Sequence, residues 1–451
     1  MKKTRTMAIG AFGIVAALSL AACSSDSDNG GEVGKTPDAT TQKTIDKVDG
    51  TGKTLNVWVM EGDYKDETLA KINSEFKTET GAEVKVQVLP WANASTKLST
   101  ALGQDDTPDI VDLGNTWVSN YAYNGALMDL SQYQDALKQD RTWLPSLIEP
   151  ATLDGKVYAV PSFAGVRVAI YNKKIWADAG ITDVPTTYAD LTADLDKIKA
   201  KNTAADFSPF YLPGKYWYAG MQWIWDAGGD IATQADGKWT GATSSAEAQK
   251  GLETWKSFQN TYSTKASQGI DTGSKTEPAQ TQIMADGKAA TIIGALWDPG
   301  SVVASSKGKV KESDLGTFAI PSSSGSGLQP VFGGGSDWGI AAKSKNQDLA
   351  LVWTKIAAGP EIQSILAAQP WIPNTVEGAK EAEGSASDLI KPYYAAAANS
   401  KAAPPAPNWL PIEGDQSVQE FFSSVALGKK TPADAAKEFD SHLDETLNGN
   451  S

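Results

Sequence analysis

Tryptophan is unusually abundant in this chain, with 15 among 451 residues. Each Trp carries a large flat apolar ring and one N–H donor, so it can pack in a core or present a face and a donor to a ligand. Carboxylates are also plentiful, with 54 Asp and Glu against 40 Lys and Arg. Two carboxylates at the right separation can hydrolyse a glycosidic bond, but sequence does not reveal that separation. A glycosidase therefore stays an alternative.

The single His and the single Cys exclude several other chemistries. A zinc site built from several His or Cys ligands is impossible, and so is a disulfide within the chain. A Ser-His-Asp hydrolase would have to use His442, which lies beside Asp444 and Glu445 in a predicted helix and is interpreted as a solvated surface residue. The net charge of −14 argues against nucleic-acid binding, which needs a basic surface. We predict neither a metal site nor a cofactor.

The one Cys follows a segment that is typical of export. Residues 1–22 begin with a basic stretch and continue with an apolar region of 13 residues, from Ala8 to Leu20, which is too short to span a bilayer. Leu20-Ala21-Ala22-Cys23 resembles the lipobox of bacterial lipoproteins, which implies acylation of Cys23, for instance with palmitate. The alternative is an ordinary secretory signal followed by a chance Cys. Residues 24–53 contain no aromatic residue and are predicted to be a flexible tether.

The first part of the body alternates between strand and helix patterns. Residues 54–60 and 83–89 alternate in hydropathy, 108–113 is a short apolar run, and the apolar positions of 66–80 recur at helical spacing. A short helix is expected around Leu98. This order is typical of βαβ units with a largely parallel sheet, which binds ligands at the carboxyl ends of its strands.

A second set of α/β patterns follows. Strands are expected at 156–161, 166–171, 290–294, 317–320 and 338–342. Helices are expected after the capping residues Thr187 and Ser244, over 348–358, around 418–425, and from Thr431-Pro432. The chain is therefore assigned to the α/β class.

Three motifs, in this order, carry a resemblance to a known family. They are Val166 to Lys173 with Ala179-Gly180-Ile181 and Pro185 to Leu191, then Phe332 to Ala342, then Leu427 to Ala436. Together they resemble the extracellular solute-binding proteins of bacterial ABC sugar importers, the group that includes maltose-binding protein. The resemblance covers about residues 54–448. It implies a two-lobe periplasmic-binding-protein-like fold with several chain crossings and a ligand cleft between the lobes.

The resemblance also implies a domain arrangement and partners. We expect a signal peptide at 1–22, a lipidated Cys and tether at 23–53, lobe one at 54–163 plus 297–338, and lobe two at 164–296 plus 339–451. The chain would be a monomer and not an enzyme, anchored by its lipid outside the cell membrane, delivering a di- or oligosaccharide to ABC permease subunits. A surface adhesin or structural lipoprotein is the further alternative.

A sugar cleft needs flat rings for C–H faces and polar groups for hydroxyls. The resemblance therefore directs attention to tryptophans in loop-like contexts: Trp91, Trp117, Trp225, Trp297, Trp338 and Trp371. The polar candidates beside the expected strand ends and crossings are Glu61, Asn115, Arg167, Asp298 and Asp337. Trp255 and Trp353 lie at apolar helical spacing and are expected in cores. The number of tryptophans favours a ligand of more than one ring.

Overall fold

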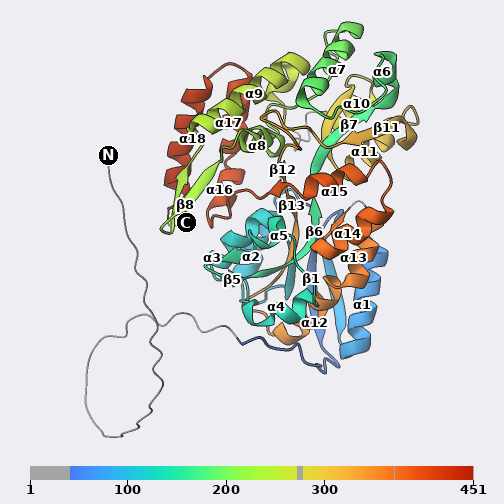
Figure 1. Ribbon diagram of the computed structural model, residues 1–451. Helices are drawn as coiled ribbons and strands as arrows, with labels where there is room; N and C mark the ends of the chain where they lie inside the picture. Colours follow the sequence, from blue (N-terminus) through green and yellow to red (C-terminus); the bar gives the residue numbers. More distant parts are fainter. Residues whose placement is uncertain (1–40, 272–277, 370, 450–451) are drawn as a thin grey trace, which may run out of the picture. The chain divides into compact units, whose positions relative to one another are not determined.

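A computed structural model describes residues 41–271, 278–369 and 371–449 (Figure 1). The expected signal peptide and Cys23 lie outside these residues. The second part of the expected tether, 41–53, lies on the folded body, which corrects the prediction there. Lys43 N donates to Gln132 O at 2.6 Å, and Ile45 and Val48 pack against the core. These two aliphatic side chains supply the apolar contact that orders the segment.

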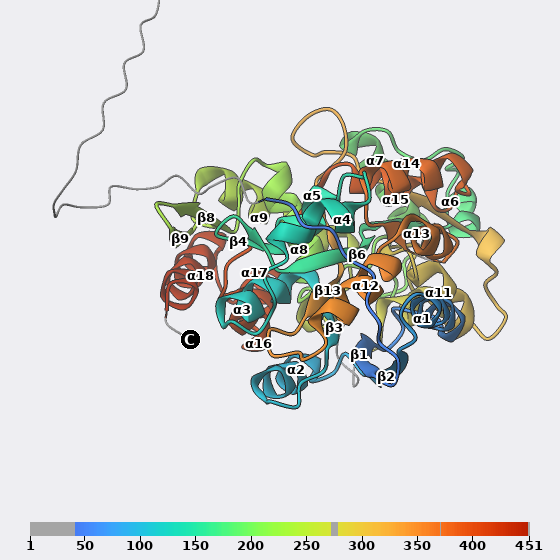
Figure 2. The same ribbon diagram turned by 90° about the horizontal axis from the view of Figure 1, so that it is seen from below.

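A six-stranded sheet forms the centre of the first lobe. Its strand order is β14 (Ile372–Pro373), β6 (Ala159–Gly165), β13 (Gly334–Ile340), β3 (Ile110–Gly114), β1 (Thr54–Met60) and β2 (Glu83–Leu89). β1 is parallel to β2 and β3, whereas β13 is antiparallel to both of its neighbours. Helices α1 (Asp66–Thr80) and α12 (Gln347–Ala357) cover one face, and α2 (Ala94–Gly103) and α3 (Val118–Tyr123) cover the other (Figure 2).

A smaller antiparallel sheet forms the centre of the second lobe. It has the order β10 (Thr291–Ala295), β7 (Arg167–Asn172) and β11 (Leu315–Phe318). Its core is shared with α7 (Tyr188–Lys201), α8 (Trp217–Asp226), α9 (Ala246–Tyr262), α17 (Ser417–Ala426) and α18 (Pro432–Leu447). In Figure 1 these helices lie in the upper half of the body and the six-stranded sheet in the lower half.

Shorter elements complete the described chain. The helices are α4 (Gln134–Lys138), α5 (Pro145–Ile148), α6 (Lys173–Asp178), α10 (Gln280–Ala285), α11 (Asp298–Ser305), α13 (Pro360–Ala367), α14 (Val376–Ser385), α15 (Lys391–Ala397) and α16 (Trp409–Gly414). The strands are β4 (Thr152–Leu153), β5 (Lys156–Val157), β8 (Ala232–Ala235), β9 (Lys238–Gly241), β12 (Val331–Phe332) and β15 (Ser400–Lys401). Single 3₁₀ turns are η1 (Asn115–Trp117), η2 (Ser131–Tyr133), η3 (Lys265–Gly269) and η4 (Glu312–Asp314).

The chain passes between the two lobes three times: from β6 to β7, from β12 to β13, and between α14 and α15. The first crossing lies where the sequence predicted it, but the expected lobe boundaries beyond residue 296 are wrong. β11 was expected in lobe one, yet it pairs with β7 through Phe318 and Ala169. α12 was expected in lobe two, yet Leu349 and Trp353 pack in the core of the first sheet. The reason is that β13 enters the middle of that sheet, so the chain stays there until α14.

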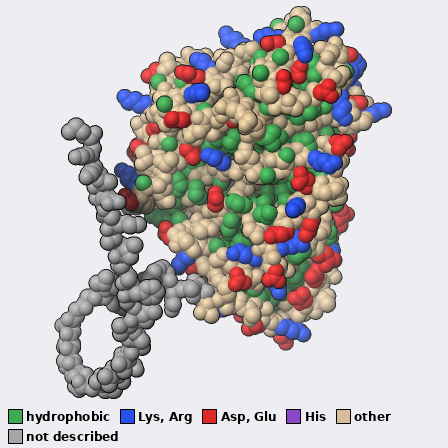
Figure 3. Space-filling view, viewed as in Figure 1, with side chains coloured by type: hydrophobic (Ala, Val, Ile, Leu, Met, Phe, Trp, Pro, Cys, Tyr) green, Lys and Arg blue, Asp and Glu red, His purple; other side chains and the backbone are tan. Residues whose placement is uncertain are grey.

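Charged side chains of both signs are interspersed over the face seen in Figure 3. Apolar side chains gather on this face near the level at which the two lobes meet. No basic stripe crosses the face in view, and nucleic-acid binding would require one. The interface between the lobes is the more informative region.

Candidate functional site

A cavity of about 480 Å³ lies between the two lobes. Its volume falls within the roughly 300–1,000 Å³ of ligand pockets. The first lobe contributes loops after β1 and β2, the end of β6, the start of β13, and the residue before β14. The second lobe contributes the start of β7 and the end of the β10 loop. The lining residues are Glu61, Gly62, Asp63, Trp91, Phe163, Gly165, Arg167, Trp297, Gly334, Gly335, Ser336 and Trp371.

Three of the predicted tryptophans form walls of this cavity. Trp91 and Trp297 leave 40% and 39% of their surface exposed, so both rings are open to a ligand. Trp371 packs on Phe163, with ring centroids 4.0 Å apart, and on Trp297 at 5.2 Å. Because Trp297 belongs to the second lobe and Trp371 to the first, this aromatic contact spans the interface.

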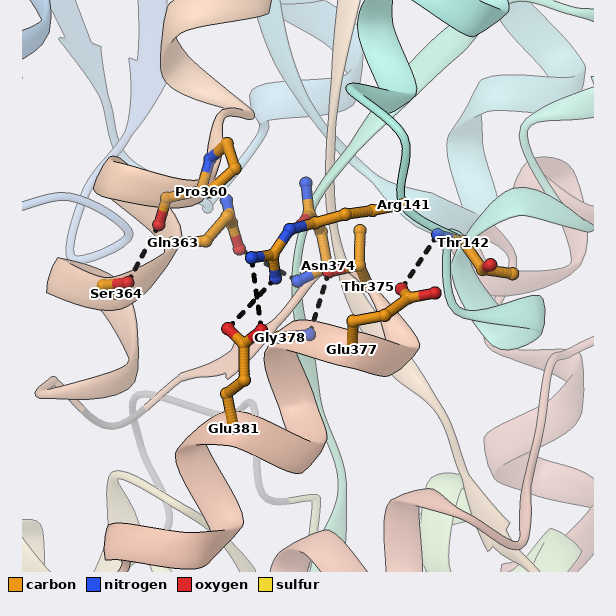
Figure 4. Close-up of polar contacts among 10 residues, drawn as sticks. All are labelled: Arg141, Thr142, Pro360, Gln363, Ser364, Asn374, Thr375, Glu377, Gly378 and Glu381. Carbon is orange, nitrogen blue, oxygen red and sulfur yellow. Dashed lines mark hydrogen bonds and ion pairs between the residues drawn. The ribbon is translucent and has the colours of Figure 1, made fainter.

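Buried amides fix the segment that carries Trp371 (Figure 4). Asn374 donates from Nδ2 to Pro161 O at 2.8 Å and to Ala358 O at 3.2 Å. Gln363 donates to Ser162 O at 2.8 Å and accepts from Asn374 N at 2.9 Å. These bonds tie the segment to β6, one residue from the cavity-lining Phe163. They hold the Trp371 ring without touching the ligand space.

Glycine is required at one side of the cavity. Gly335 has a φ of 153°, and a Cβ there would lie 2.2 Å from Phe163 O. A Cβ on Gly165 would lie 3.1 Å from the Trp297 ring. The bare backbone lets the strands and the indole approach each other, which shapes the cavity wall.

Arg167 supplies a positive charge at the cavity. Its Nε donates to Tyr216 Oη at 2.6 Å, and its guanidinium lies 4.3 Å from the centroid of the Tyr218 ring. The side chain is 9% exposed, so its position is fixed by these neighbours. Arg167 can therefore present its remaining N–H donors in a defined direction, as recognition of a hydroxyl requires.

The cavity is also lined by a carboxyl group, that of Asp63, whose pKa is raised. Asp63 accepts from Ser336 Oγ at 2.8 Å, and burial together with the nearby Asp112 raises its pKa well above the ordinary value. Burial raises the pKa of Asp112 to about 7, against a hydrogen bond from Met60 N. Two carboxyls so placed favour sharing a proton. Asp63 can then donate to or accept from a ligand hydroxyl.

No cluster of three or more His, Cys, Asp or Glu that could hold a metal ion occurs among the described residues.

Glu61, by contrast with Asp63, is exposed at the rim of the cavity. Of the predicted site residues, the structure thus brings together Glu61, Trp91, Arg167, Trp297 and Trp371.

Two predicted tryptophans lie away from the cavity lining, in cores. Trp338 is fully buried, with its ring between Tyr64 at 5.2 Å and Trp353 at 4.9 Å. Trp225 is 3% exposed in α8 and donates to Asp230 Oδ1 at 3.1 Å. Their glycine-rich surroundings suggested loops, but the rings fill the interiors of the two lobes. Trp255 and Trp353, predicted for cores, are both fully buried.

Two further candidates support the wall from behind. Trp117 does not line the cavity but packs edge-on against Trp91, with centroids 5.6 Å apart. Asn115 donates from Nδ2 to Gly333 O at 3.2 Å and to Ser146 O at 3.3 Å, which joins β3 to the glycine segment before β13.

The two remaining acidic candidates do not line the cavity: Asp298 is half-buried and Asp337 is fully buried. Asp298 accepts from Ala295 N at 2.8 Å; burial raises its pKa to about 6, while that hydrogen bond and Arg167 act in the opposite direction. Asp337 is fully buried in β13, and burial with the neighbouring Asp112 raises its pKa well above the ordinary value. Within the described chain neither oxygen of Asp337 has a hydrogen-bond partner. A neutral, protonated carboxyl fits that position.

Sequence reasoning missed Asp63, Phe163 and Ser336. Asp63 lies two residues after Glu61 in the same loop. Its position just after the carboxyl end of the predicted strand 54–60 was therefore a signal that could have identified it. Ser336 stands next to the predicted Asp337, but the strand alternation that turns Ser336 toward Asp63 depends on the register with β6. Phe163 gave no signal, because the expected strand ended at residue 161, whereas β6 continues to Gly165 where it pairs with β13 and β14.

Two lobes, three crossings and an aromatic cavity between them define a ligand-binding protein of the two-lobe class. The chain matches the bacterial extracellular solute-binding proteins over residues 62–364 and belongs to that family. It is 34% identical to the diacetylchitobiose binding protein DasA of Streptomyces coelicolor, over 99% of each chain. It is 27% identical to a maltooligosaccharide ABC transporter solute-binding lipoprotein of Streptococcus pneumoniae, over 90% of this chain and 92% of the relative.

Solved structures share the fold. The sugar-binding protein MalE of Xanthomonas citri superposes with a TM-score of 0.72 at 22% identity, over 88% of this chain and 97% of that one. The GacH receptor of Streptomyces glaucescens, solved with and without acarbose, gives a TM-score of 0.72 at 21% identity, over 88% and 99%. These likenesses confirm the predicted two-lobe α/β fold.

Proposed function

We propose that this chain binds a short oligosaccharide outside the cell and delivers it to the membrane subunits of an ABC importer. The observation that carries the proposal is the cavity between the lobes, walled by Trp91, Trp297 and Trp371. Indole faces stack on the C–H faces of pyranose rings, while Arg167 and Asp63 can bond hydroxyls. Family membership and the names of the relatives support the same class.

Among oligosaccharides, we propose a disaccharide of N-acetylated sugars. The most similar of the relatives named above is a diacetylchitobiose binding protein. The chemistry of the cavity agrees, because four aromatic rings face it and few charged groups do. Acetamido methyl groups add apolar surface that such rings can cover, whereas an unmodified glucose disaccharide would leave it unused.

Calorimetry with N,N′-diacetylchitobiose, N-acetylglucosamine, maltose and maltotriose tests the proposal. We expect saturable binding of diacetylchitobiose and weaker or no binding of the others. Tight binding of maltotriose with none of diacetylchitobiose would overturn the choice of N-acetylated sugar but keep the class. Failure to bind any oligosaccharide in a broader glycan panel would overturn the class itself.

The chain acts as a binding protein rather than an enzyme in this proposal. Its relatives are named as binding proteins, and nothing favours the glycosidase alternative. Incubation with diacetylchitobiose should leave the sugar intact by chromatography, and product formation at a rate above the buffer blank would contradict the assignment.

We also propose that Cys23 anchors a monomer to the outer face of the cell membrane. No helix of the described chain is long and apolar enough to cross a membrane. One relative is named as a lipoprotein. Cys23→Ser should move the protein from the membrane fraction to the medium with sugar affinity unchanged. Retention of the variant in the membrane fraction would contradict lipidation at this residue.

A further inference from the structure

Glu413 connects the two lobes through tryptophan N–H groups. It lies in α16, whose Trp409 and Ile412 belong to the core of the second lobe. Its Oε1 accepts from Trp409 Nε1 at 2.8 Å, within the same helix. Its Oε2 accepts from Trp117 Nε1 at 3.2 Å, from the first lobe. One carboxylate therefore holds one indole from each lobe.

Trp117 transmits this contact to the cavity. It ends the 3₁₀ turn η1, directly after β3, and its ring packs edge-on against Trp91 at 5.6 Å and 69°. Both rings lie over Gly114, where a Cβ would be 3.5 Å from Trp117 and 3.6 Å from Trp91. Trp91 in turn lines the cavity. A shift of Trp117 would therefore move the cavity wall.

Within the described residues, the carboxylate of Glu413 is surrounded by neutral hydrogen-bond donors instead of a cationic partner. In the part of the chain that the structure describes, no Lys, Arg or His forms an ion pair with it; its partners are neutral donors. Burial raises the pKa of Glu413, and the hydrogen bonds from Thr116, Trp117 and Trp409 oppose that rise. Hydrogen bonds to an ionised acceptor are about twice as strong as neutral ones. A second, neutral contact runs beside it, from Asn120 Nδ2 to Pro407 O at 2.8 Å.

We propose that Glu413 is a positioning residue that clasps the two lobes beside the cavity and fixes the Trp91 wall through Trp117. The functional role of this clasp rests on the proposed sugar binding. Its effect on the arrangement of the lobes does not require a sugar. It stabilises the arrangement in which Trp91 faces Trp297 and Trp371. A binding-competent arrangement that is populated beforehand raises the apparent affinity for the ligand.

Three variants of the full chain separate the clasp from ordinary helix stabilisation. Glu413→Gln replaces one acceptor oxygen with an NH₂ group. Trp117→Phe keeps an aromatic ring but removes the N–H that crosses between the lobes. Trp409→Phe is the matched control, because it removes an N–H bond to the same carboxylate within one helix. A fourth chain combines Glu413→Gln with Trp117→Phe.

The first measurement is small-angle scattering without sugar. Glu413→Gln and Trp117→Phe should enlarge the radius of gyration relative to wild type, while Trp409→Phe should leave it unchanged. An unchanged radius in the first two variants would overturn the clasp. If the radius grows as expected but no sugar binds even to wild type, the clasp stands and the proposed function fails.

The second measurement is sugar affinity, with diacetylchitobiose as the probe. Glu413→Gln and Trp117→Phe should each weaken binding about 10- to 150-fold, which corresponds to the loss of one charge-assisted hydrogen bond. The double variant should bind diacetylchitobiose no less tightly than the single variant with the lower affinity, because the two substitutions remove the same contact. Fully additive losses would mean that Glu413 acts on the sugar directly, which would overturn the positioning role.

Discussion

Trp297 keeps 39% of its surface exposed at the cavity, whereas Trp338, in the central strand of the sheet beneath, is fully buried. Their sequence surroundings are alike, since each follows a glycine-containing segment that reads as a loop. The difference arises from pairing: Trp338 lies opposite Asp112 in the β13–β3 ladder, between Tyr64 and Trp353. The identity of each residue predicted the chemistry of its ring. Which ring faces the cavity depends on the strand pairing, which sequence alone does not give.

Truncating these two tryptophans should have opposite effects. Trp297→Ala should weaken sugar binding by about 1–3 kcal/mol, roughly 5- to 150-fold, with little loss of stability, because it removes an exposed stacking face. Trp338→Ala should lower the free energy of unfolding by about 3–5 kcal/mol, with the affinity of the folded protein nearly kept. Calorimetry and denaturant unfolding measure the two. Equal affinity losses in both variants would contradict the division into wall and core.

Asp298 predicts a pH effect on stability. Its pKa is raised by burial to about 6, above the roughly 3.9 of an unfolded chain, so the folded state binds its proton more tightly. Its contribution to the free energy of unfolding is therefore largest below about pH 4 and falls by about 3 kcal/mol as the pH rises to about 6. Asp298→Asn can still accept from Ala295 N and should lack this fall.

The measurement is urea unfolding of both proteins at several pH values. The stability of wild type minus that of Asp298→Asn should decrease between about pH 4 and about pH 6 and be level below that window. A difference that stays constant across the window would show that Asp298 keeps an ordinary pKa in the folded protein.

At the scale of elements, sequence patterns predicted the bounds of helices and strands correctly where the signal lies within the segment itself. β1, α1 and β2 have the predicted bounds, because hydropathy alternation and the glycine after α1 are contained in each segment. Thr187 and Thr431 cap α7 and α18 as expected, each accepting from the backbone N–H three residues on. β14 was not predicted, because two residues form a strand only by pairing with β6, some 210 residues earlier. The lobe assignment failed for the same reason.

The amide network behind β14 yields a prediction about this element. Asn374→Ala leaves the buried Pro161 and Ala358 carbonyls without their donor, which should cost roughly 2–3 kcal/mol of stability. It should also weaken sugar binding by the folded protein, since the Trp371 segment loses its attachment to β6. The matched control is Arg141→Ala, which breaks a partly exposed ion pair with Glu381 (Figure 4) and should cost less than about 1 kcal/mol.

Denaturant unfolding and calorimetry distinguish the two variants. A stability loss in Asn374→Ala with wild-type affinity would show that Trp371 keeps its place without the amide. A loss of affinity in Arg141→Ala as large as that in Asn374→Ala would mean that α14 as a whole, rather than Asn374, positions the ring.

At the scale of the molecule, the cavity is shared between two lobes, and the described chain connects them by three passages: β6 to β7, β12 to β13, and α14 to α15. A ligand that touches Arg167 and Trp297 on one side and Trp91 and Asp63 on the other stabilises the arrangement in which both sets face it. We expect saturating diacetylchitobiose to reduce the radius of gyration measured by small-angle scattering, as hinge closure does. An unchanged radius at saturation would indicate a rigid pair of lobes.

The central place of β13 bears on how this protein is made. β13 pairs with both β6 and β3, so the first sheet lacks its middle strand until residue 340 has been synthesised, more than 200 residues after β3. Such late, distant pairing gives a high contact order and slows folding. An emerging chain therefore has a nascent first lobe without its middle strand, which keeps it unfolded for longer. For a polypeptide with the export signal that the sequence predicts at residues 1–22, slow folding would leave time for passage through a secretion channel before the sheet forms on the far side.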